Sequence, residues 1–534
     1  NCVQLAHLLL LKNSTMEPPL KVVVLDLWDI LLSQPVPVST TISRHVLKDI
    51  FTTDIWHSYE CGQLSDDDIC KEIAVRYSLD VADVVGILEQ TQKITTQNES
   101  LIQSLQALKG KDENGVILCA MLNISTAGYA AIRHRIAEWA IFDRVFTSSQ
   151  TGMRKPDLGF YQHVLSETRQ SPGEVIFVES NPEHVLPARS VGSHVILHTD
   201  ESSLFQSLHN LLGNPVERGN EFLRVNAKQL DSVTNTGVTI RDNFTQLLIL
   251  EATNNRELIY LEEHSRTWNY FIGKSLLTST TYPDDFDTTC TALTVLEPDI
   301  KIVSSVMDEL VGYVSNDGIV LTYFDRSRPR VDPVVCVNVM RLFYKHGRGH
   351  ELQKTLHWVR DVLKSRAYIE GTRYYPTPEA FLYFLSRLLE NANDIYIHGE
   401  LFHILRERVK ERVGLPGDAL CLAMRILTCQ YVGVPDEADL AKLRSMQHAD
   451  GGWEPGWVYR YGKTDVRIGN RGLATALAVN ALSQAEVYKT SQDARPAQEG
   501  VFSTSIPTGF KTFYWTVVNW IYSYPQSVKT SSYK

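Results

Sequence analysis

Five short apolar runs alternate with helical segments between residues 21 and 199, and this alternation most constrains the fold. The runs are rich in Val and Ile and end in polar residues: KVVVLDLWDILL, GVILCAMLNIS, DRVFTSS, EVIFVESN and SHVILHTD. Segments with helical spacing, such as GYAAIRHRIAEWA and DLGFYQHVLSET, separate them. Strands that alternate with helices predict a parallel α/β sheet, with functional residues at the carboxyl ends of the strands. Residues 39–108 lack a strand pattern and predict a helical insertion.

From about residue 215 the strand pattern largely disappears and amphipathic helical segments follow one another, such as DPVVCVNVMRLFYKHG, PEAFLYFLSRLLENA and DALCLAMRILTCQYVG. A chain of 534 residues is also too long for one ordinary core. The sequence therefore predicts an α/β domain at residues 16–214, with a helical cap at about 39–108, and an all-α domain at 215–534. Residues 1–15, which precede Met16, are expected to be a tag or a disordered leader.

Composition excludes several functional classes. The 52 Lys and Arg residues against 62 Asp and Glu residues give a net charge of −10, which does not suit a protein that holds nucleic acid by bulk charge. The eight Cys residues include no CxxC pair, so a structural zinc site or a disulfide framework is not expected. No run approaches the ~18–20 apolar residues of a membrane span. We expect a cytoplasmic protein.

Three segments of the first half carry motifs in a recognisable order. VVVLDLWDIL places Asp26 directly after the first strand, GMRKPDLGFY contains Lys155, and VIFVESNPEHVLPARSVG places Glu179 at the end of a later strand. Over about 180 residues this order resembles the haloacid dehalogenase-type phosphatases. The resemblance implies that Asp26 occupies the nucleophile position, that Lys155 orients phosphate and nucleophile, that Glu179 is one of the metal-binding acids, and that Mg²⁺ is the cofactor.

The departures from that family pattern matter more than the matches. Trp28 occupies the general-acid position and has no proton to give, and Leu122 occupies the Ser/Thr position unless Ser125 shifts the alignment. Glu179-Ser180 replaces the pair of metal-binding Asp residues. Phosphoryl transfer to an Asp requires Mg²⁺ to offset phosphate charge and an acid to protonate the leaving group. We therefore interpret the first domain as a degenerate phosphatase, in which the nucleophile-position Asp and the Lys remain as a structural salt bridge.

The second half carries two further motifs. TSTTYPDDFDTTCTALTVL places Asp285 and Asp287 directly before an apolar helical run, and helix capping alone is one explanation for these acids. In LRSMQHADGGWEPGW, Gln447, Gly451 and Trp453 fit the pattern Q-x-x-x-G-x-W. Together, inside a helical domain, the two motifs resemble class II terpene cyclases, in which the Gln/Trp repeat staples the outer helices of an α/α barrel.

The resemblance assigns roles to the acid motif. In the family motif Asp-x-Asp-Asp the middle Asp is the proton donor, so Asp287 is the donor here, Asp285 its supporting acid, and Thr288 and Thr289 follow it. A carboxyl crowded by another carboxyl can keep a proton at neutral pH, which protonation of an alkene demands. The Asp-x-Asp-Thr-Thr variant resembles fused enzymes that join a haloacid dehalogenase-like domain to a terpene cyclase β domain, the drimane-type sesquiterpene synthases, which act on farnesyl diphosphate.

A cyclase also needs aromatic walls for its cation and cations for its diphosphate. The aromatic candidates adjoin the two motifs: Phe286, Trp453, Trp457 and Tyr459. The diphosphate candidates are Arg326, Arg328, Arg330, Lys274, Arg373 and Lys463. Ordinary core packing for the aromatic residues, and a solvated loop or pairing with Asp325 and Asp332 for the arginines, are the alternatives. Mg²⁺ is expected to assist diphosphate binding, with ligands that the sequence does not identify.

These observations predict a class II sesquiterpene cyclase that protonates farnesyl diphosphate and yields drimenyl or albicanyl diphosphate, which a separate phosphatase then hydrolyses. One alternative is a bifunctional enzyme whose first domain releases drimenol or albicanol. A second is a non-catalytic helical scaffold fused to a dead hydrolase. Geranylgeranyl diphosphate as substrate, the site of final proton loss, its stereochemistry and a homodimer remain open at this stage.

Overall fold

The computed structural model describes residues 22–33, 37, 39, 41–91, 96–111, 115–279, 281–462 and 464–493. For residues 110, 111 and 486–493 it describes the backbone alone. The leader predicted at residues 1–15 and the diphosphate candidate Lys463 lie outside the described residues. None of the described helices is long and apolar enough to cross a membrane.

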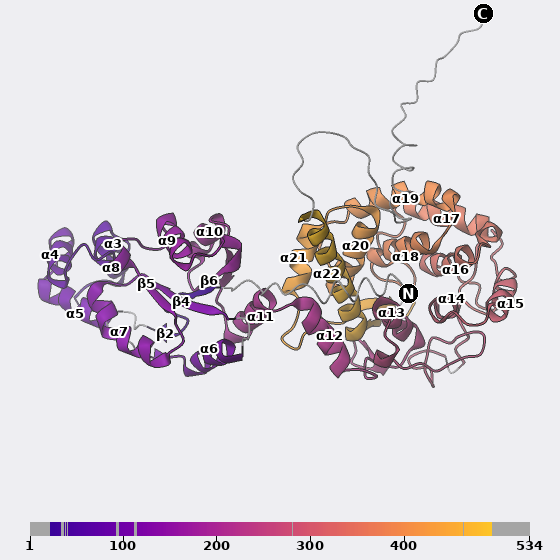
Figure 1. The fold of residues 1–534 in the computed structure, drawn as a ribbon, viewed down its shortest axis with the longest axis horizontal. Coiled ribbons are helices and arrows are strands. Elements are labelled where there is room, and N and C mark those ends of the chain that lie inside the picture. The colour runs from indigo at the N-terminus through magenta and orange to yellow at the C-terminus, as the bar shows by residue number, and fades with distance from the viewer. Residues whose placement is uncertain are drawn as a thin grey trace, which may run out of the picture. The chain divides into compact units, whose positions relative to one another are not determined.

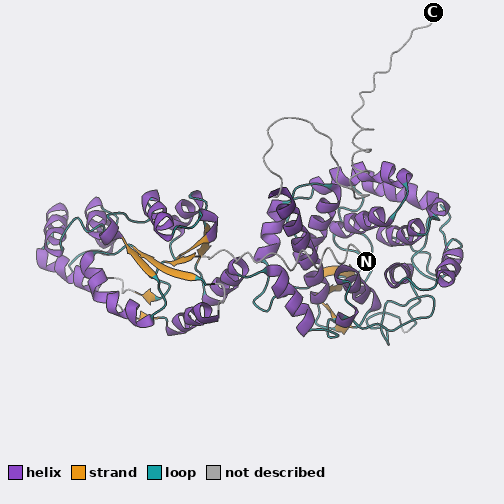
Figure 2. Ribbon diagram, viewed as in Figure 1, coloured by secondary structure: helices purple, strands orange, loops and turns teal. Residues whose placement is uncertain are grey.

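The first domain is built on a five-stranded parallel sheet, and each of its strands falls in one of the five predicted apolar runs (Figure 2). The strand order is β5-β4-β1-β6-β7. The strands are β1 (Val22–Leu25), β4 (Ile117–Leu122), β5 (Arg144–Thr147), β6 (Val175–Glu179) and β7 (His194–Leu197). Because all five run in parallel with β1 in the centre, the residues that follow β1, β4 and β6 meet at one edge of the sheet.

Helices cover both faces of this sheet. Val23 and Leu25 of β1 belong to one apolar core, which includes side chains of α6 (Glu99–Lys111), α7 (Thr126–Trp139) and α11 (Glu201–Leu212). Val22 and Val24 point to a second core, formed with α9 (Leu158–Thr168) and α10 (Pro182–Ser190). This alternation is the period-2 geometry of a strand buried on both faces, and it explains why the run Val22–Leu25 is apolar throughout. Two short helices complete the domain, α8 (Ser148–Thr151) and η1 (Pro172–Glu174).

The helical insertion is shorter than the sequence predicted. Its helices are α2 (Arg44–Ile50), α3 (Asp54–Glu60), α4 (Asp66–Tyr77) and α5 (Val81–Thr91), which share a small core of their own. The strand pair β2 (Leu32–Ser33) and β3 (Thr96–Gln97) joins the two ends of this cap. Leu101 and Leu105 of α6, which the prediction placed in the cap, belong instead to the core of the sheet. The helical pattern alone could not assign α6, because a helix that covers a sheet and one in a cap have the same spacing.

The second domain alternates inner helices, whose described side chains are mostly buried, with outer helices that bury one side, as in an α/α barrel (Figure 1). The inner helices are α13 (Asn243–Thr253), α14 (Phe286–Leu296), α16 (Pro333–Lys345), α18 (Pro378–Asn391), α20 (Ala419–Val432) and α22 (Arg471–Asp493). The outer helices are α12 (Pro215–Val225), α15 (Ile300–Leu310), α17 (Gln353–Lys364), α19 (Ile395–Lys410) and α21 (Glu437–Ser445). The contacts run from α13 to α14, α16, α18 and α20 in order. Short 3₁₀ turns are η2 (Arg256–Leu258) and η3 (Gly349–Leu352).

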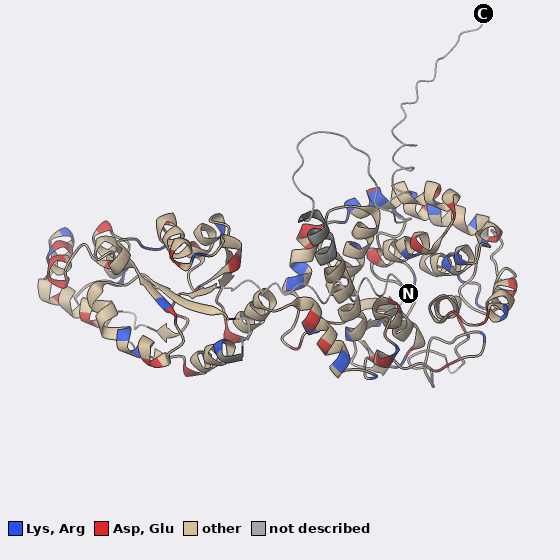
Figure 3. Ribbon diagram, in the orientation of Figure 1, with Lys and Arg blue, Asp and Glu red and all other residues tan. Residues whose placement is uncertain are grey.

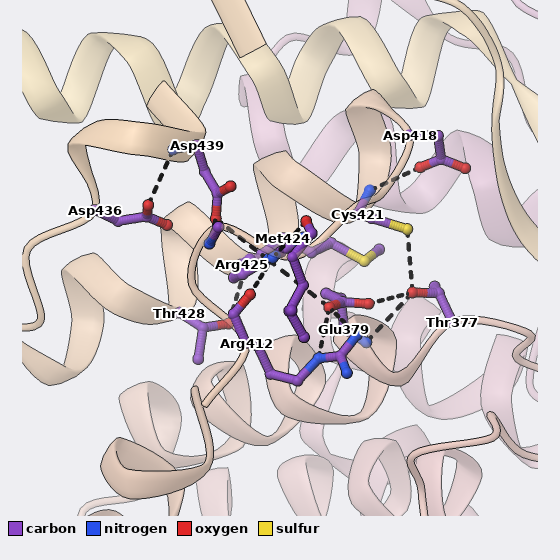
Figure 4. Close-up of polar contacts among 12 residues, drawn as sticks. Thr377, Glu379, Arg412, Asp418, Cys421, Met424, Arg425, Thr428, Asp436 and Asp439 are labelled. Atoms are coloured by element: carbon purple, nitrogen blue, oxygen red, sulfur yellow. Dashed lines mark hydrogen bonds and ion pairs between the residues drawn. The ribbon is translucent and has the colours of Figure 1, made fainter. Parts of the chain in front are cut away.

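Charge follows this inner and outer arrangement. The outer helix α19 carries charged residues on its exposed side, such as Glu407 and Lys410 (Figure 3). Several of the charged residues that enter the barrel wall are paired with one another. Arg425 of α20, almost fully buried, lies 3.4 Å from Asp439 of α21 and 3.8 Å from Glu379 of α18 (Figure 4). Pairing of this kind offsets the cost of burial and ties inner helices to an outer one.

A small antiparallel sheet in the second domain was not predicted from the sequence. Its order is β10-β11-β8-β9, with β8 (Ser232–Thr234), β9 (Thr239–Ile240), β10 (Gly456–Arg460) and β11 (Arg467–Asn470). Strands of two to five residues give too few positions for an alternating pattern to be recognised. The sheet matters for function because β10 carries Tyr459 into the interior of the barrel, where this side chain is 7% exposed.

Candidate active sites

The acid motif begins an inner helix of the barrel. Asp285 is the N-cap of α14, and its Oδ1 accepts a hydrogen bond of 2.7 Å from the backbone N–H of Thr288. Thr289 Oγ1 accepts from the Trp268 N–H at 2.9 Å, which fixes the first turn of the helix to the preceding loop. Helix capping, the alternative explanation from the sequence, therefore describes Asp285 but leaves Asp287 without that role.

Asp287 lies in the first turn of α14 and is held by two neutral donors. The side-chain amide of Asn338, on α16, donates to Asp287 Oδ1 at 2.6 Å. The hydroxyl of Tyr375, in the loop before α18, donates to Asp287 Oδ2. Among the ion pairs of the described residues, none includes Asp287. Burial raises the pKa of Asp287 to about 7, although the hydrogen bonds from Tyr375 and Asn338 act to lower it.

Asp285 contributes to the acid site in a different way from the one the sequence suggested. Its Oδ2 is buried and has no hydrogen-bond partner, and the direct partners of Asp287 are Asn338 and Tyr375 rather than Asp285. Burial raises the pKa of Asp285 well above its usual value, and the charge of Asp287 raises it further. The charge of Asp287 thus disfavours ionisation of Asp285, although the two carboxyl groups share no hydrogen bond.

Five aromatic rings form a cluster that includes Tyr375, one of the two donors to Asp287. Tyr459 lies 4.9 Å from Tyr375, 5.3 Å from Phe244 and 5.5 Å from Tyr270 between ring centroids. Phe384 lies 5.7 Å from Tyr375. Their faces carry negative electrostatic potential, which stabilises a nearby cation. Of the four aromatic residues singled out from the sequence, Tyr459 is in this cluster, and Phe244, Tyr270, Tyr375 and Phe384 join it from other segments.

The other three aromatic candidates have packing contacts elsewhere. Phe286 packs against Phe324 at 4.5 Å and Tyr313 at 5.7 Å. Trp453 donates from its indole N–H to Leu443 O at 2.8 Å and is fully buried. Trp457 lies under a guanidinium, with the Arg467 Cζ 5.3 Å from its ring centroid. These contacts indicate structural roles.

The Gln/Trp motif does act as a staple. Gln447 Nε2 donates to Pro215 O at 2.9 Å and to Gly451 O at 2.8 Å, so that the turn after α21 holds the first residue of α12. Gly219 of α12 lies against the Trp453 ring, where an added Cβ would stand 3.2 Å from Cζ3. The motif joins two outer helices.

Two of the diphosphate candidates lie beside the acid segment. Phe286 N–H donates to Thr322 O at 2.9 Å, and Thr322 N–H donates to Arg330 O at 2.9 Å, so the two segments are adjacent. Arg330 donates to the Tyr374 hydroxyl at 3.4 Å, and Arg373 stacks at 5.7 Å from the Tyr374 ring centroid. Neither guanidinium forms an ion pair with a described carboxylate, and Arg373 Nε has no hydrogen-bond partner among the described residues.

The other described candidates for diphosphate binding either contact groups of the protein or are exposed on a loop. Arg328 pairs with Asp325 at 3.1 Å. This pairing was an alternative considered from the sequence. Arg326 donates to Gly312 O at 2.9 Å and stacks on Tyr313. Lys274 is exposed on the loop before the acid motif.

The first domain also buries carboxylates, but it pairs them with a cation. Lys155 Nζ lies 2.8 Å from Asp26 Oδ2 and 2.9 Å from Glu179 Oε2, and all three side chains are at most 5% exposed. His184 Nδ1 lies 3.2 Å from Glu179 Oε2. Burial would raise the pKa of Glu179, but the Lys155 ammonium and the His184 contact bring it below its usual value. Burial raises the pKa of Asp26 in spite of Lys155. The predicted salt bridge between Asp26 and Lys155 is present.

The residues that depart from the phosphatase pattern lie near the Asp26–Lys155 pair. Trp28, which the resemblance places at the general-acid position, donates from its indole N–H to Asn123 O at 3.3 Å. Asn123, which follows β4, exchanges two hydrogen bonds of 2.8 Å with the Lys155 backbone. Leu122 is fully buried in the core, and Ser125 caps α7. Leu122 is therefore the last residue of β4, next to the site, and Ser125 lies beyond it at the start of α7.

Three buried side chains at this site could act as ligands of a metal ion. Asp26, Glu179 and His184 each offer one ligand atom, and these atoms lie within 4.8 Å of one another. Mg²⁺ prefers six oxygen ligands, whereas an imidazole nitrogen suits zinc and other transition metals. The Lys155 ammonium already contacts both carboxylates. This donor set does not fit Mg²⁺ well, and we derive no step through a metal here.

A buried carboxyl group with two neutral hydrogen-bond donors inside a helical barrel, together with a parallel α/β domain, is the arrangement of a class II terpene cyclase fused to a haloacid dehalogenase-like domain. A family model described as the sesquiterpene cyclase astC-like C-terminal domain matches residues 216–346. The drimenol cyclase drtB of Aspergillus calidoustus is 42% identical over 467 residues, which are 88% of each protein. The chain belongs to the family of drimane-type sesquiterpene synthases.

Two further similarities each cover part of the chain. The sesquiterpene phosphatase astK of Aspergillus oryzae is 31% identical over 193 residues, which are 36% of this chain and 97% of that protein. The solved structure of the type II terpene cyclase MstE from Scytonema covers 51% of this chain and 98% of that chain, with a TM-score of 0.38 and 14% identity. The protein is an enzyme, a class II sesquiterpene cyclase with a haloacid dehalogenase-like domain.

Proposed function

We propose that the enzyme cyclises farnesyl diphosphate to a bicyclic drimane-type diphosphate, albicanyl or drimenyl diphosphate. The observation that carries the proposal is the environment of Asp287, which is 7% exposed, has neutral hydrogen-bond partners and has a pKa raised to about 7. A carboxyl group in these surroundings keeps its proton near neutral pH and can transfer it to an alkene.

Each residue of the acid site has a part in the reaction. Asp287 transfers its proton to the terminal alkene of the substrate, and the cation that results is attacked in turn by the two remaining double bonds. Asn338 and Tyr375 stabilise the Asp287 carboxylate as it forms, because both donate to its oxygens. The rings of Tyr459 and its aromatic neighbours stabilise the moving positive charge. The diphosphate ester stays intact through the cyclisation, since protonation rather than departure of the leaving group starts it.

The diphosphate is proposed to bind at Arg330 and Arg373. Both guanidinium groups lack a carboxylate partner, both lie beside Tyr374, and the Arg330 segment adjoins the acid segment through Thr322. Guanidinium groups bind phosphate oxygens with two parallel hydrogen bonds. Mg²⁺ is proposed to accompany the substrate as a counter-ion of its diphosphate.

The product is proposed to keep its diphosphate, so that a separate phosphatase must release the alcohol. In the first domain, Trp28 occupies the general-acid position, Leu122 replaces the Ser/Thr, and Lys155 satisfies both carboxylates. A second candidate is a bifunctional enzyme that releases drimenol or albicanol itself. Two observations favour it: Asp26 and Lys155 are retained, and the relatives are a sesquiterpene phosphatase and a drimenol cyclase.

Incubation of the purified chain with farnesyl diphosphate and Mg²⁺ tests both proposals. Mass spectrometry should detect a bicyclic diphosphate, and the free alcohol should appear only after alkaline phosphatase is added. An alcohol that forms without this addition and disappears in Asp26→Asn would establish the bifunctional enzyme. A parallel incubation with geranylgeranyl diphosphate measures chain-length preference. Absence of any cyclic product from either substrate would contradict the cyclase proposal and favour a non-catalytic scaffold.

A further inference from the structure

The acid Asp287 is the end of a short series of buried hydroxyl groups. Tyr375 donates to Asp287 Oδ2, and the hydroxyls of Tyr375 and Tyr459 lie 3.2 Å apart, close enough to exchange a hydrogen bond in either direction. Tyr375 is fully buried and Tyr459 is 7% exposed. The two tyrosines come from different elements, the loop before α18 and strand β10, so that their meeting at the acid is a feature of the fold.

The far end of this series lies among aromatic rings. The Tyr459 ring is flanked by Phe244 and Tyr270, and among the described residues its hydroxyl has one hydrogen-bond partner, Tyr375. The nearby Tyr270 hydroxyl has no partner. No described carboxylate, lysine or histidine forms a hydrogen bond with Tyr459. A proton that passes along these hydroxyl groups to Asp287 therefore starts at Tyr459, in the part of the barrel whose aromatic rings stabilise the cation.

The proposed reaction, on which this inference rests, begins and ends with a proton transfer. The alkene takes a proton from Asp287, and the cyclised cation later loses one from a neighbouring methyl or methylene group. The substrate and product are isomers, so that no net proton is consumed. Asp287 nevertheless ends each turnover as a carboxylate and must recover a proton before the next.

We propose that Tyr459 accepts the proton lost by the cyclised cation and that Tyr375 passes a proton on to Asp287, so that the enzyme recycles its proton within the barrel. The C–H bond of the cation breaks, its electron pair forms the new alkene, and its proton binds the Tyr459 oxygen. The Tyr459 proton moves to the Tyr375 oxygen, and the Tyr375 proton moves to Asp287 Oδ2. Rotation of the hydroxyl groups then restores the starting donors. Tyr459 is the catalytic base in this scheme, and Tyr375 is a relay and positioning residue.

Isotopic labelling tests the proposal on the full chain. Farnesyl diphosphate deuterated at the methyl and methylene groups that can lose the final proton is converted over many turnovers in ordinary water. The expected product carries deuterium at the ring carbon formed from the terminal alkene, because the substrate's own label returns through Tyr459 and Tyr375. A product with no deuterium at that carbon would overturn the proposal, and would mean that the proton comes from solvent. Failure to form any bicyclic product would instead contradict the proposed function.

Variants separate the relay from a packing role. Tyr459→Phe removes one hydroxyl and leaves the Tyr375–Asp287 hydrogen bond in place. Because another base must then take the final proton, bicyclic product should form at least tenfold more slowly from the first turnover on, and the product should carry no transferred deuterium. Deuterium transfer that persists in Tyr459→Phe would contradict the relay. Tyr368→Phe is the matched control, because Tyr368 is buried, stacks on Phe381 at 4.9 Å and has a hydroxyl without a partner. Tyr368→Phe should leave label transfer unchanged.

Discussion

Both domains of this enzyme bury carboxylates next to the residues of their active sites, and they do so in opposite ways. In the first domain Asp26 and Glu179 each lie within 2.9 Å of the Lys155 ammonium. In the second domain Asp287 contacts an amide and a hydroxyl. The Lys155 cation brings the pKa of Glu179 below its usual value, whereas burial beside neutral donors leaves the pKa of Asp287 raised to about 7. The difference in partners separates a structural ion pair from a carboxylic acid that keeps its proton.

The barrel itself contains the same contrast. Glu251 of α13 is mostly buried, with 9% of its side chain exposed, but it pairs with Arg341 and Arg387 of the neighbouring inner helices. Burial would raise the pKa of Glu251, and the two guanidinium groups lower it to about 2. Asp287, one helix away along the chain, has a pKa of about 7. The barrel wall therefore stabilises a carboxylate at one place and a carboxylic acid at another, according to where it supplies arginine.

The largest expected effect is on the acid itself. Asp287→Asn removes the transferable proton and keeps the size of the side chain, so that cyclisation should fall by at least ~10³-fold, at the upper end of the range for a general acid. The measurement is the rate of bicyclic product formation, with circular dichroism to establish that the variant is folded. Asp299→Asn, at the exposed N-cap of the outer helix α15, is the matched control and should retain activity. If Asp287→Asn is as active as the wild type, Asp287 is not the proton donor, and the contrast between the two domains fails.

In the first domain the buried carboxylates have a cationic partner, so removal of that cation should reduce stability. Lys155→Met leaves Asp26 and Glu179 buried without their cation, which should cost about 3–5 kcal/mol of the free energy of unfolding. Thermal unfolding of the isolated variant measures this change. Arg144→Met, at a partly exposed ion pair with Glu167, should cost less than about 1 kcal/mol. Similar small losses in both variants would show that the buried ion pair is not needed.

The neutral donors of Asp287 are expected to set its acid strength. Asn338→Ala removes a hydrogen bond that stabilises the carboxylate, so cyclisation should fall by about 10–100-fold, equivalent to about 1.5–3 kcal/mol. The same change should raise the pKa of Asp287. Since the protonated form is active, the wild-type rate should be constant at low pH and fall above about pH 7, and this fall should move to higher pH in the variant. A pH profile that does not move would contradict the assignment.

A smaller effect is expected at the diphosphate site. Arg373→Ala removes a guanidinium that has no carboxylate partner, and the KM for farnesyl diphosphate should rise by about tenfold while kcat changes little. Arg326→Ala, whose guanidinium contacts Gly312 O and Tyr313, should leave the KM unchanged. Equal effects of the two substitutions would mean that general positive charge, rather than a defined site, attracts the substrate.

The sequence predicted those parts of the molecule that depend on local pattern. The five strands of the parallel sheet, the inner helices and the acid motif each lie within one continuous segment, so that periodicity or spacing reveals them. The partners of Asp287 could not be found in this way. Asn338 and Tyr375 follow it by 51 and 88 residues, in segments without a motif, and only the closing of the barrel brings them to the acid.

The same reason explains the misplaced aromatic residues. Nearness in sequence favoured Phe286, beside the acid, and Trp453, in the Gln/Trp motif. In a helix, however, adjacent residues point in different directions, and Phe286 packs on Phe324 while Asp287 faces Asn338. Phe244 and Tyr270 enter the aromatic cluster from segments that no motif marks.

The protonation state of Asp287 in the resting enzyme tests the account most directly. Infrared difference spectra between the wild type and Asp287→Asn, recorded from pH 4 to pH 9, isolate the carboxyl stretch of this one side chain. The account predicts a band of a protonated carboxyl that persists at pH 6 and is half lost near pH 7. A band already half lost near pH 4, the range of an ordinary aspartate, would contradict it.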